Sequence, residues 1–248
     1  MMPCRFGLQV LALLALLVSP LFSSAQEPAY GRPESHVGIG VKFSTMGAGI
    51  EAAIPITSNT NLRGGFNIFS YSRGLDRDGI HYAGDWSFRS VQATFDWLPF
   101  HGAFHLSPGV LVYNGNELTA VANAPAGRTF TLGGTTYASS AVDPVHGNGK
   151  IEFNKAAPMV LAGWGNLIPR SGKRFSFPFE FGVVFSGAPT ASLSLAGTAC
   201  DASLVNCRAI TSDPTIQANI QSERRRIDDD LSSFKVYPIV SIGFAFNF

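Results

Sequence analysis

Residues Phe175–Phe185 have the sequence FSFPFEFGVVF, in which an apolar side chain occupies every second position. A strand points successive side chains to opposite faces, whereas a helix repeats about every 3.6 residues, so this pattern predicts a strand. The segment Lys235–Phe248, with the sequence KVYPIVSIGFAFNF, repeats the alternation. Both segments are therefore predicted to have one apolar face and one face that is mostly small or polar.

The same alternation recurs along the chain and predicts an all-β fold. Met46-Gly47 is expected to be the tight turn between the first two strands. The parity of the alternation changes between Phe153 and Val160, which we attribute to a β-bulge near Lys155-Ala156. Turn-forming residues separate eight segments of this kind, at 37–44, 49–56, 62–73, 86–99, 105–119, 149–166, 175–185 and 235–248.

Connections between these segments alternate in length, except at Met46-Gly47. This alternation is typical of outer-membrane barrels, which have tight periplasmic turns and longer outer loops. The short connections are 58–61, 100–104 and 169–173, and the predicted long loops are 74–85, 121–148 and 187–233.

The alternation by itself fits either a soluble sandwich or a membrane barrel, because lipid can take the place of the core against the apolar face. Charged residues make up 14% of the chain, against about 25% in a soluble domain. The chain ends at Phe248, and aromatic residues concentrate at the strand ends, as in an interfacial girdle. We therefore predict a closed antiparallel eight-stranded transmembrane β-barrel.

Charge and targeting signals narrow the location and the partners. The chain has 18 Lys plus Arg and 17 Asp plus Glu, a net charge of +1, which argues against a nucleic-acid partner. Residues 1–25 have the basic start, the apolar stretch and the small residues Ser23 and Ala25 of a cleaved signal peptide. The mature domain would then be 26–248, exported to the outer membrane with lipid as its surroundings.

Two cysteines, Cys200 and Cys207, remain in the mature chain. In an oxidising compartment, thiols this close in sequence form a disulfide more often than a metal or catalytic site. We expect a loop disulfide between them.

The last residues, SIGFAFNF, resemble the assembly signal of Gram-negative outer-membrane barrels, with Ser241, Gly243, Phe246 and Phe248 at the characteristic positions. This resemblance implies that the barrel-assembly machinery binds the last strand. The mature chain also resembles a group of uncharacterised eight-stranded outer-membrane proteins, which implies a fold and a location but no established activity. The segments that carry this second resemblance are LRGGFN at 62–67, DWLPF at 96–100, AGWGN at 162–166 and Tyr237-Pro238.

The alternation places seven polar side chains inside the barrel. Eight strands leave an interior that side chains can just fill, and charges buried there must be paired. We therefore predict a closed lumen with a charge network, in which Lys42 lies opposite Glu51 and Arg63 is available to Asp96 or Glu180. A selective polar channel is the alternative. The seven residues are Lys42, Glu51, Arg63, Asn67, Gln92, Asp96 and Glu180.

The outer loops contain two recognisable elements. Ser212 or Asp213 can cap a helix over 213–231, whose isoleucines and Leu231 share one stripe, in the last long outer loop. This helix either covers the barrel or binds a partner. The segment 128–137 alternates around Gly133-Gly134 and predicts a hairpin.

Signals for catalysis, cofactors and metals are weak. Asp76, Asp78 and His81 could serve an aspartyl-type protease or a calcium site, but the other ligands of a calcium loop are missing and a polar turn explains them as well. His101 and His105 flank a turn but lack a third metal ligand. We predict a non-enzymatic protein without cofactors that acts in envelope structure or surface recognition. A small-solute pore is the alternative, and a lipid- or peptide-modifying enzyme is a more distant one.

Overall fold

The computed structural model describes residues 37–77, 79–100 and 102–248. The expected signal peptide at 1–25, the start of the mature chain, Asp78 and His101 lie outside the described residues. Within the described residues the structure is all-β with one α-helix.

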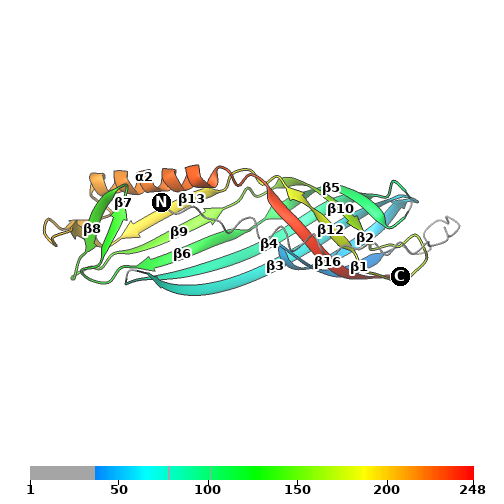
Figure 1. Ribbon diagram of the computed structural model, residues 1–248, viewed down its shortest axis with the longest axis horizontal. Helices are drawn as coiled ribbons and strands as arrows, with labels where there is room; N and C mark the ends of the chain where they lie inside the picture. The colour runs from blue at the N-terminus through cyan, green and yellow to red at the C-terminus, as the bar shows by residue number, and fades with distance from the viewer. Residues whose placement is uncertain (1–36, 78, 101) are drawn as a thin grey trace, which may run out of the picture.

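Eight antiparallel strands close into a barrel, which confirms the predicted fold class (Figure 1). Going around the barrel, each strand is hydrogen-bonded to the next one, and the last strand of the chain is hydrogen-bonded to the first. Around the barrel the strands are β1 (Gly38–Ser44), β2 (Gly47–Thr57), β3 (Thr60–Arg77), β4 (Ile80–Trp97), β5 (Phe104–Asn114), β10 (Ala157–Trp164), β12 (Phe179–Val184) and β16 (Tyr237–Asn247). The two-residue strand β11 (Phe175–Ser176) pairs with β16 in the same register as β12, so the predicted strand 175–185 is present with an interruption at Phe177-Pro178.

The turn between β1 and β2 lies one residue before the predicted Met46-Gly47, and β2 begins at Gly47. Ser44 pairs with Gly47, so Thr45 and Met46 make the turn. Gly47 has a φ of 104°, and a Cβ there would lie 2.3 Å from the Ile68 carbonyl oxygen. This position therefore requires glycine, both for its left-handed backbone and for the close approach of β3.

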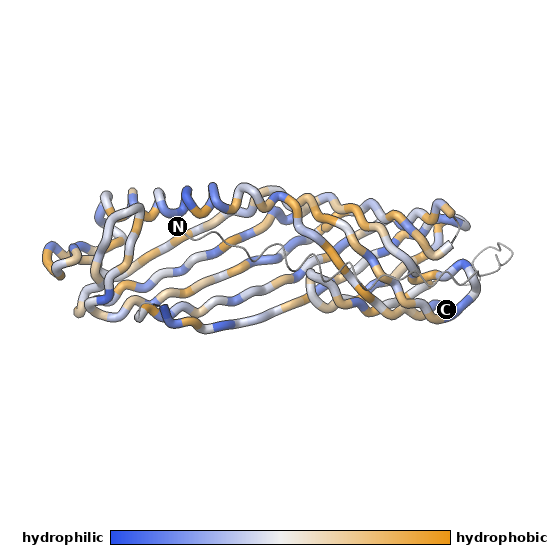
Figure 2. The backbone as a smooth tube through the Cα atoms, in the orientation of Figure 1, coloured by the Kyte–Doolittle hydropathy of each residue, from blue (hydrophilic) through white to orange (hydrophobic). Residues whose placement is uncertain are grey.

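The outward face of the barrel is apolar, and hydrophobic residues recur along its strands (Figure 2). In water such a band would be far larger than the apolar patches of soluble proteins, whereas hydrocarbon would match it. Exposed side chains of this band include Ile39, Val41, Phe43, Ile50, Ile54, Leu62, Phe66, Ile68, Phe95, Val160, Phe179, Phe181, Val240, Ile242 and Phe244.

Beyond the barrel, β3 and β4 continue as one hairpin and begin a branch of the same sheet, here called the extension. The outer half of β4 pairs with a strand that belongs to no part of the barrel, and two more strands follow. These added strands are β6 (Glu117–Asn123), β9 (His146–Glu152) and β13 (Thr190–Ala196).

The extension corrects the predicted long loops. Residues 74–85 are not a loop, because all but the tip of this segment continues β3 and β4. The segments 121–148 and 187–233 likewise contain strands. The expected bulge near Lys155-Ala156 is also absent: the parity changes because β9 pairs in the extension and β10 in the barrel, so two strands occupy what alternation suggests is one. In the same way, the predicted strand 105–119 divides between β5 and β6.

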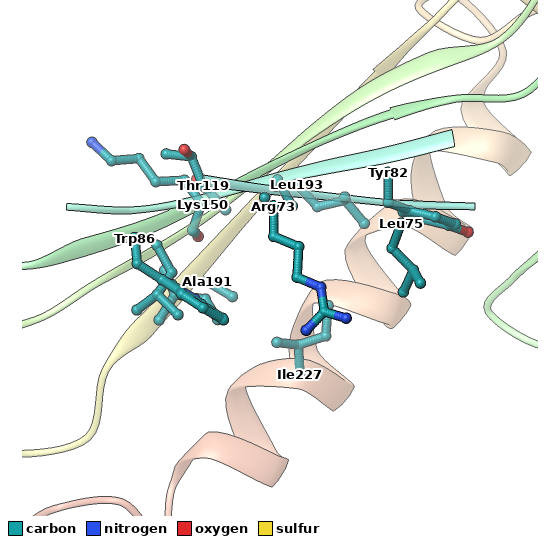
Figure 3. A pocket seen from close by; sticks show the side chains of 15 residues that line it. Arg73, Leu75, Tyr82, Trp86, Thr119, Lys150, Ala191, Leu193 and Ile227 are labelled. Atoms are coloured by element: carbon teal, nitrogen blue, oxygen red, sulfur yellow. Dashed lines mark hydrogen bonds between the residues drawn. The ribbon is translucent and has the colours of Figure 1, made fainter. Parts of the chain in front are cut away.

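The helix α2 (Pro214–Leu231) lies over the extension, with Ile227 facing the sheet (Figure 3). Asp213 is its N-cap, accepting hydrogen bonds from the backbone N–H groups of Thr215 and Ile216. The bond from Ile216, together with the Arg208 guanidinium, lowers the pKa of the Asp213 carboxyl. No helix in the described part of the chain is long and apolar enough to cross a membrane. A small second sheet packs against α2 and consists of β7 (Thr129–Leu132), β8 (Thr135–Ser139), β14 (Thr198–Asp201) and β15 (Arg208–Ala209).

Candidate functional site

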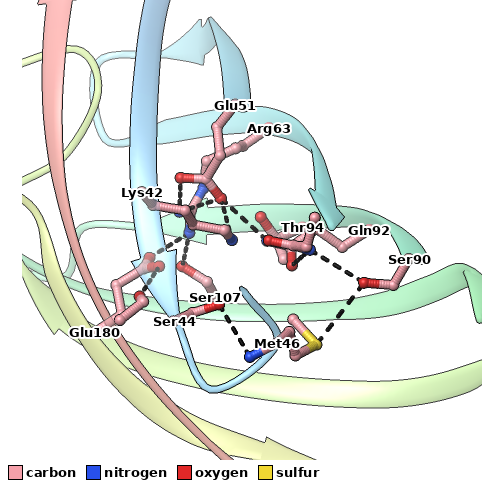
Figure 4. A network of polar contacts seen from close by, with 12 residues as sticks. Lys42, Ser44, Met46, Glu51, Arg63, Ser90, Gln92, Thr94, Ser107 and Glu180 are labelled. Atoms are coloured by element: carbon pink, nitrogen blue, oxygen red, sulfur yellow. Dashed lines mark hydrogen bonds and ion pairs between the residues drawn. The ribbon is translucent and has the colours of Figure 1, made fainter. Parts of the chain in front are cut away.

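Inward-facing side chains form a buried polar network in the barrel (Figure 4). Arg63 on β3 lies at its centre and is 1% exposed. Its Nη1 lies 3.2 Å from Glu51 Oε2, and its Nη2 lies 2.9 Å from Asp96 Oδ1 and 2.5 Å from Glu180 Oε1. Because a guanidinium has five N–H donors in one plane, a single cation here bridges carboxylates from β2, β4 and β12.

The side chains of Lys42 and His105 also contact these carboxylates. Lys42 pairs with Gly49 and not with Glu51 across the β1–β2 ladder, contrary to the prediction, but it reaches Glu51 diagonally, with its Nζ 2.6 Å from Glu51 Oε1. His105 Nε2 lies 2.9 Å from Glu180 Oε1, and the histidine is fully buried. All five residues of the predicted lumen network are therefore in contact in one cluster, and Arg63 contacts both of its predicted partners together with Glu51.

Neutral donors complete the coordination of each carboxylate. Gln92 Nε2 donates to Glu51 Oε1 at 3.1 Å, Ser107 Oγ to Asp96 Oδ1 at 2.7 Å, and Ser241 Oγ to Glu180 Oε2 at 3.3 Å. A buried carboxylate is costly unless it is paired and hydrogen-bonded. Each of the three carboxylates meets both conditions.

His105 belongs to the network, although the sequence analysis assigns it no place in the lumen. The alternation along its strand indicates which way its side chain points. His105 and Ser107 alternate with the apolar Phe104 and Leu106, so His105 belongs to the inward face.

Apolar layers lie on both sides of the charge network. Toward the extension, Met46 in the first turn packs with side chains from β5, β10, β12 and β16. At the opposite end, Leu167 and Ile168 pack with Ala53 and Ala245. The first layer consists of Met46, Leu111, Ala157, Met159, Leu161, Val184 and Ile239.

The residues of the predicted assembly signal lie on both faces of β16. Ser241 faces inward and contacts Glu180, and Gly243 lies against β1, where a Cβ would be 2.9 Å from the Val41 carbonyl oxygen. Phe246 faces outward, and its ring centroid is 4.8 Å from that of Phe248. Phe248 is 69% exposed, and its N–H donates to the Val37 carbonyl.

The other predicted residues lie in the extension and the second sheet. Cys200 and Cys207 are joined by a disulfide that links β14 to the segment before β15. His81 Nδ1 lies 2.8 Å from Asp76 Oδ1, and both side chains are exposed. Across the described ranges, no three His, Cys, Asp or Glu side chains gather in a group that could hold a metal ion.

The inner face of the extension continues the interior face of the barrel, but its chemistry changes. Along β3 the inward positions pass from Arg63 and Asn67 to Phe69, Tyr71 and Leu75. Tyr71 stacks on Trp86 of β4 with ring centroids 5.1 Å apart. The polar interior of the barrel thus gives way to an apolar surface that α2 covers.

A groove of about 630 Å³ lies between this surface and α2 (Figure 3). A second cavity of about 240 Å³ shares Tyr82, Ala120, Gly149 and Leu193 with it, so the two are continuous. The groove is of the size that small-molecule sites have. Its apolar lining includes Leu75, Tyr82, Trp86, Leu118, Leu193 and Ile227.

Two solved structures from Acinetobacter baumannii are similar to this chain over most of its length. The crystal structure of CarO matches with a TM-score of 0.52 and 22% identity, covering 85% of this chain and 97% of that one. The crystal structure of CarO2 matches with a TM-score of 0.52 and 19% identity, covering 86% and 98%. Both are outer-membrane barrels, and at these identities the likeness shows the fold alone. No family model and no curated protein matches the chain.

The fold thus defines the class: this chain is an eight-stranded β-barrel of the outer-membrane type. Within the described residues, its barrel encloses a charge network centred on Arg63, and a grooved extension lies beside it.

Proposed function

We propose that this protein is a non-enzymatic outer-membrane barrel with a closed lumen that acts in surface recognition through its extension. The proposal includes export by a signal peptide at 1–25 and binding of β16 by the barrel-assembly machinery. The Arg63 network is the observation that carries it, because it joins four strands across the interior at the place where a pore would need open space.

Two physical arguments support a closed lumen over a pore. An ion crossing this interior would have to separate charges that are paired at 2.5 to 3.2 Å, and removing one partner of a buried pair costs about 3–5 kcal/mol. It would also have to cross the apolar layer around Met46 and Met159, where water lacks polar partners.

Single-channel recording of the refolded protein in a planar bilayer tests the proposal. We expect no steady ion conductance from the wild type or from the Glu180→Gln variant, because the apolar layers remain in both. Heat-modifiable gel migration and a β circular dichroism spectrum confirm folding before each recording. Steady conductance whose ion preference changes in Glu180→Gln would overturn the closed lumen and identify a pore.

The assembly part of the proposal predicts different effects in cells and in vitro. Because the Phe248 side chain is mostly exposed, Phe248→Ala should leave the urea unfolding midpoint of the refolded barrel nearly unchanged. The same substitution should lower the amount of folded barrel in the outer membrane of expressing cells several-fold. Val240→Ala, an exposed change on the same strand outside the signal, is the control. Equal membrane levels of the Phe248→Ala and control variants would contradict the role of this residue.

A further inference from the structure

The groove of the extension contains a cation without a partner. Arg73 lies on β3 between Tyr71 and Leu75, on the face that α2 covers, and its side chain extends toward Ile227 (Figure 3). Within residues 37–77, 79–100 and 102–248 its guanidinium has no hydrogen-bond or ion-pair partner. Arg73 is exposed, so a ligand anion can reach its guanidinium and form a charge-assisted hydrogen bond without first displacing a protein partner.

The nearest other cation on the sheet does not serve this groove. Lys150 on β9 points to the opposite face, where its ammonium lies 3.0 Å from Glu117 Oε2 and 2.9 Å from Glu152 Oε1. These two hydrogen-bonded carboxylates raise the pKa of Lys150. Its charge is thus balanced outside the groove.

At the mouth of the groove, positively and negatively charged side chains are equal in number. A wider cavity of about 1010 Å³ opens beside Leu75, Tyr82 and Ile227, and its charged side chains are two arginines and two acids. Asp228 on α2 accepts a hydrogen bond from the N–H of Ala191 in the groove wall at 2.7 Å, so its carboxylate is already held, whereas Arg73 has no ion pair within the described residues. The four mouth residues are Arg77, Glu223, Arg226 and Asp230.

We propose that the groove binds a free long-chain carboxylate, with its hydrocarbon chain along the inner face of the extension and its carboxylate on Arg73. The apolar wall from Trp86 to Leu193 suits a hydrocarbon chain, and the planar guanidinium matches a carboxylate with two parallel hydrogen bonds. A single groove with one cation fits a ligand that has one hydrocarbon chain and one negative charge. This inference rests on the proposed function in taking the extension as the recognition surface.

Tryptophan quenching by brominated ligands tests the proposal in the reconstituted full-length protein. The chain has 3 tryptophans. Trp97 and Trp164 lie on the outward face of the barrel, so Trp97→Phe combined with Trp164→Phe leaves Trp86 in the groove as the single reporter. The probes are dibrominated stearate and dibrominated stearyl alcohol, added to protein in phosphatidylcholine vesicles.

We expect saturable quenching of Trp86 by the stearate, with about tenfold weaker binding of the alcohol, because a charge-assisted hydrogen bond contributes at least that factor. Arg73→Gln should weaken stearate binding about tenfold and leave alcohol binding unchanged. Lys150→Gln, which removes a cation from the opposite face, should change neither. Ala120→Phe, which fills the groove, should abolish quenching by both probes.

Three outcomes would overturn the proposal. Absence of saturable quenching would exclude an apolar ligand in the groove, and equal affinities for stearate and alcohol would exclude the role of Arg73. Saturable quenching by brominated phosphatidylcholine with the affinity of stearate would identify a membrane lipid as the occupant. Bilayer conductance is measured separately, so a conducting barrel that binds stearate would contradict the closed lumen while leaving this inference intact.

Discussion

Replacing Arg63 by methionine is expected to destabilise the folded barrel by about 3–5 kcal/mol, the range found when a buried ion pair loses one partner. The methionine side chain fills most of the volume but leaves three carboxylates without their shared cation. Glu51 keeps Lys42 at 2.6 Å, whereas Asp96 keeps only the neutral donors Ser107 and Thr94. The loss is measured as a shift of the urea unfolding midpoint of the refolded protein, followed by heat-modifiable migration.

Two comparisons separate a charge effect from a packing effect. Arg208, whose side chain is 61% exposed, pairs with the N-cap Asp213, which keeps its backbone hydrogen bonds in Arg208→Met, so this change should not shift the midpoint measurably. Combining Arg63→Met with Glu51→Gln, Asp96→Asn and Glu180→Gln should recover much of the loss, since amides are far less costly to bury than carboxylates. If the combined variant is less stable than Arg63→Met alone, the network stabilises the barrel by its shape and not by its charge.

A second large effect is expected at Gly182 on β12. A Cβ at this position would lie 2.1 Å from the Val160 carbonyl oxygen and 2.8 Å from the Leu161 Cα, both backbone atoms of β10. The backbone of a closed barrel cannot move away without breaking hydrogen bonds between strands. Gly182→Ala should therefore lower the free energy of unfolding by about 3 kcal/mol, the upper part of the range for overpacked cores. The refolded fraction on a gel and the urea midpoint both report the loss.

Gly64→Ala is the matched control for the position of the methyl group. Gly64 is also a glycine within a barrel strand, but a Cβ there has no neighbour closer than 4.0 Å, at the Gln92 carbonyl oxygen. The control should refold as the wild type does. Equal losses in the two variants would mean that glycine itself, and not the approach of β10 to β12, determines the effect.

The membrane part of the fold could be predicted because lipid imposes a simple rule on it. Every strand there needs apolar residues on one face, so the period of two identifies the strand and the direction of each side chain. The tight turn, which the sequence places within one residue of its observed position, puts Lys42 and Glu51 on the same face of neighbouring strands and so brings them into contact. The N-cap Asp213 and Pro214 mark the start of α2 in the same local way.

The extension could not be predicted because no such rule applies to it. Its strands lie outside the lipid-facing band, and their partners are far away in the sequence: β13 pairs with β9, and β9 with β6. Local alternation cannot show that β9 pairs in the extension while β10 pairs in the barrel. The groove depends on all of these pairings together with the placement of α2, so the role of Arg73 has no local signal.

The hairpin of β3 and β4 joins the two parts without a break. Its 18 residue pairs run in one register from Thr60 and Trp97 to Arg77 and Ile80. At about 3.4 Å per residue the hairpin measures roughly 60 Å, against an apolar band about 25 Å tall in barrels of this kind. With no hinge between barrel and extension, a force on α2 would tilt the whole molecule in the bilayer. Local bilayer thickness around the barrel, which sets tilt through hydrophobic mismatch, would then determine how far the groove stands from the cell surface.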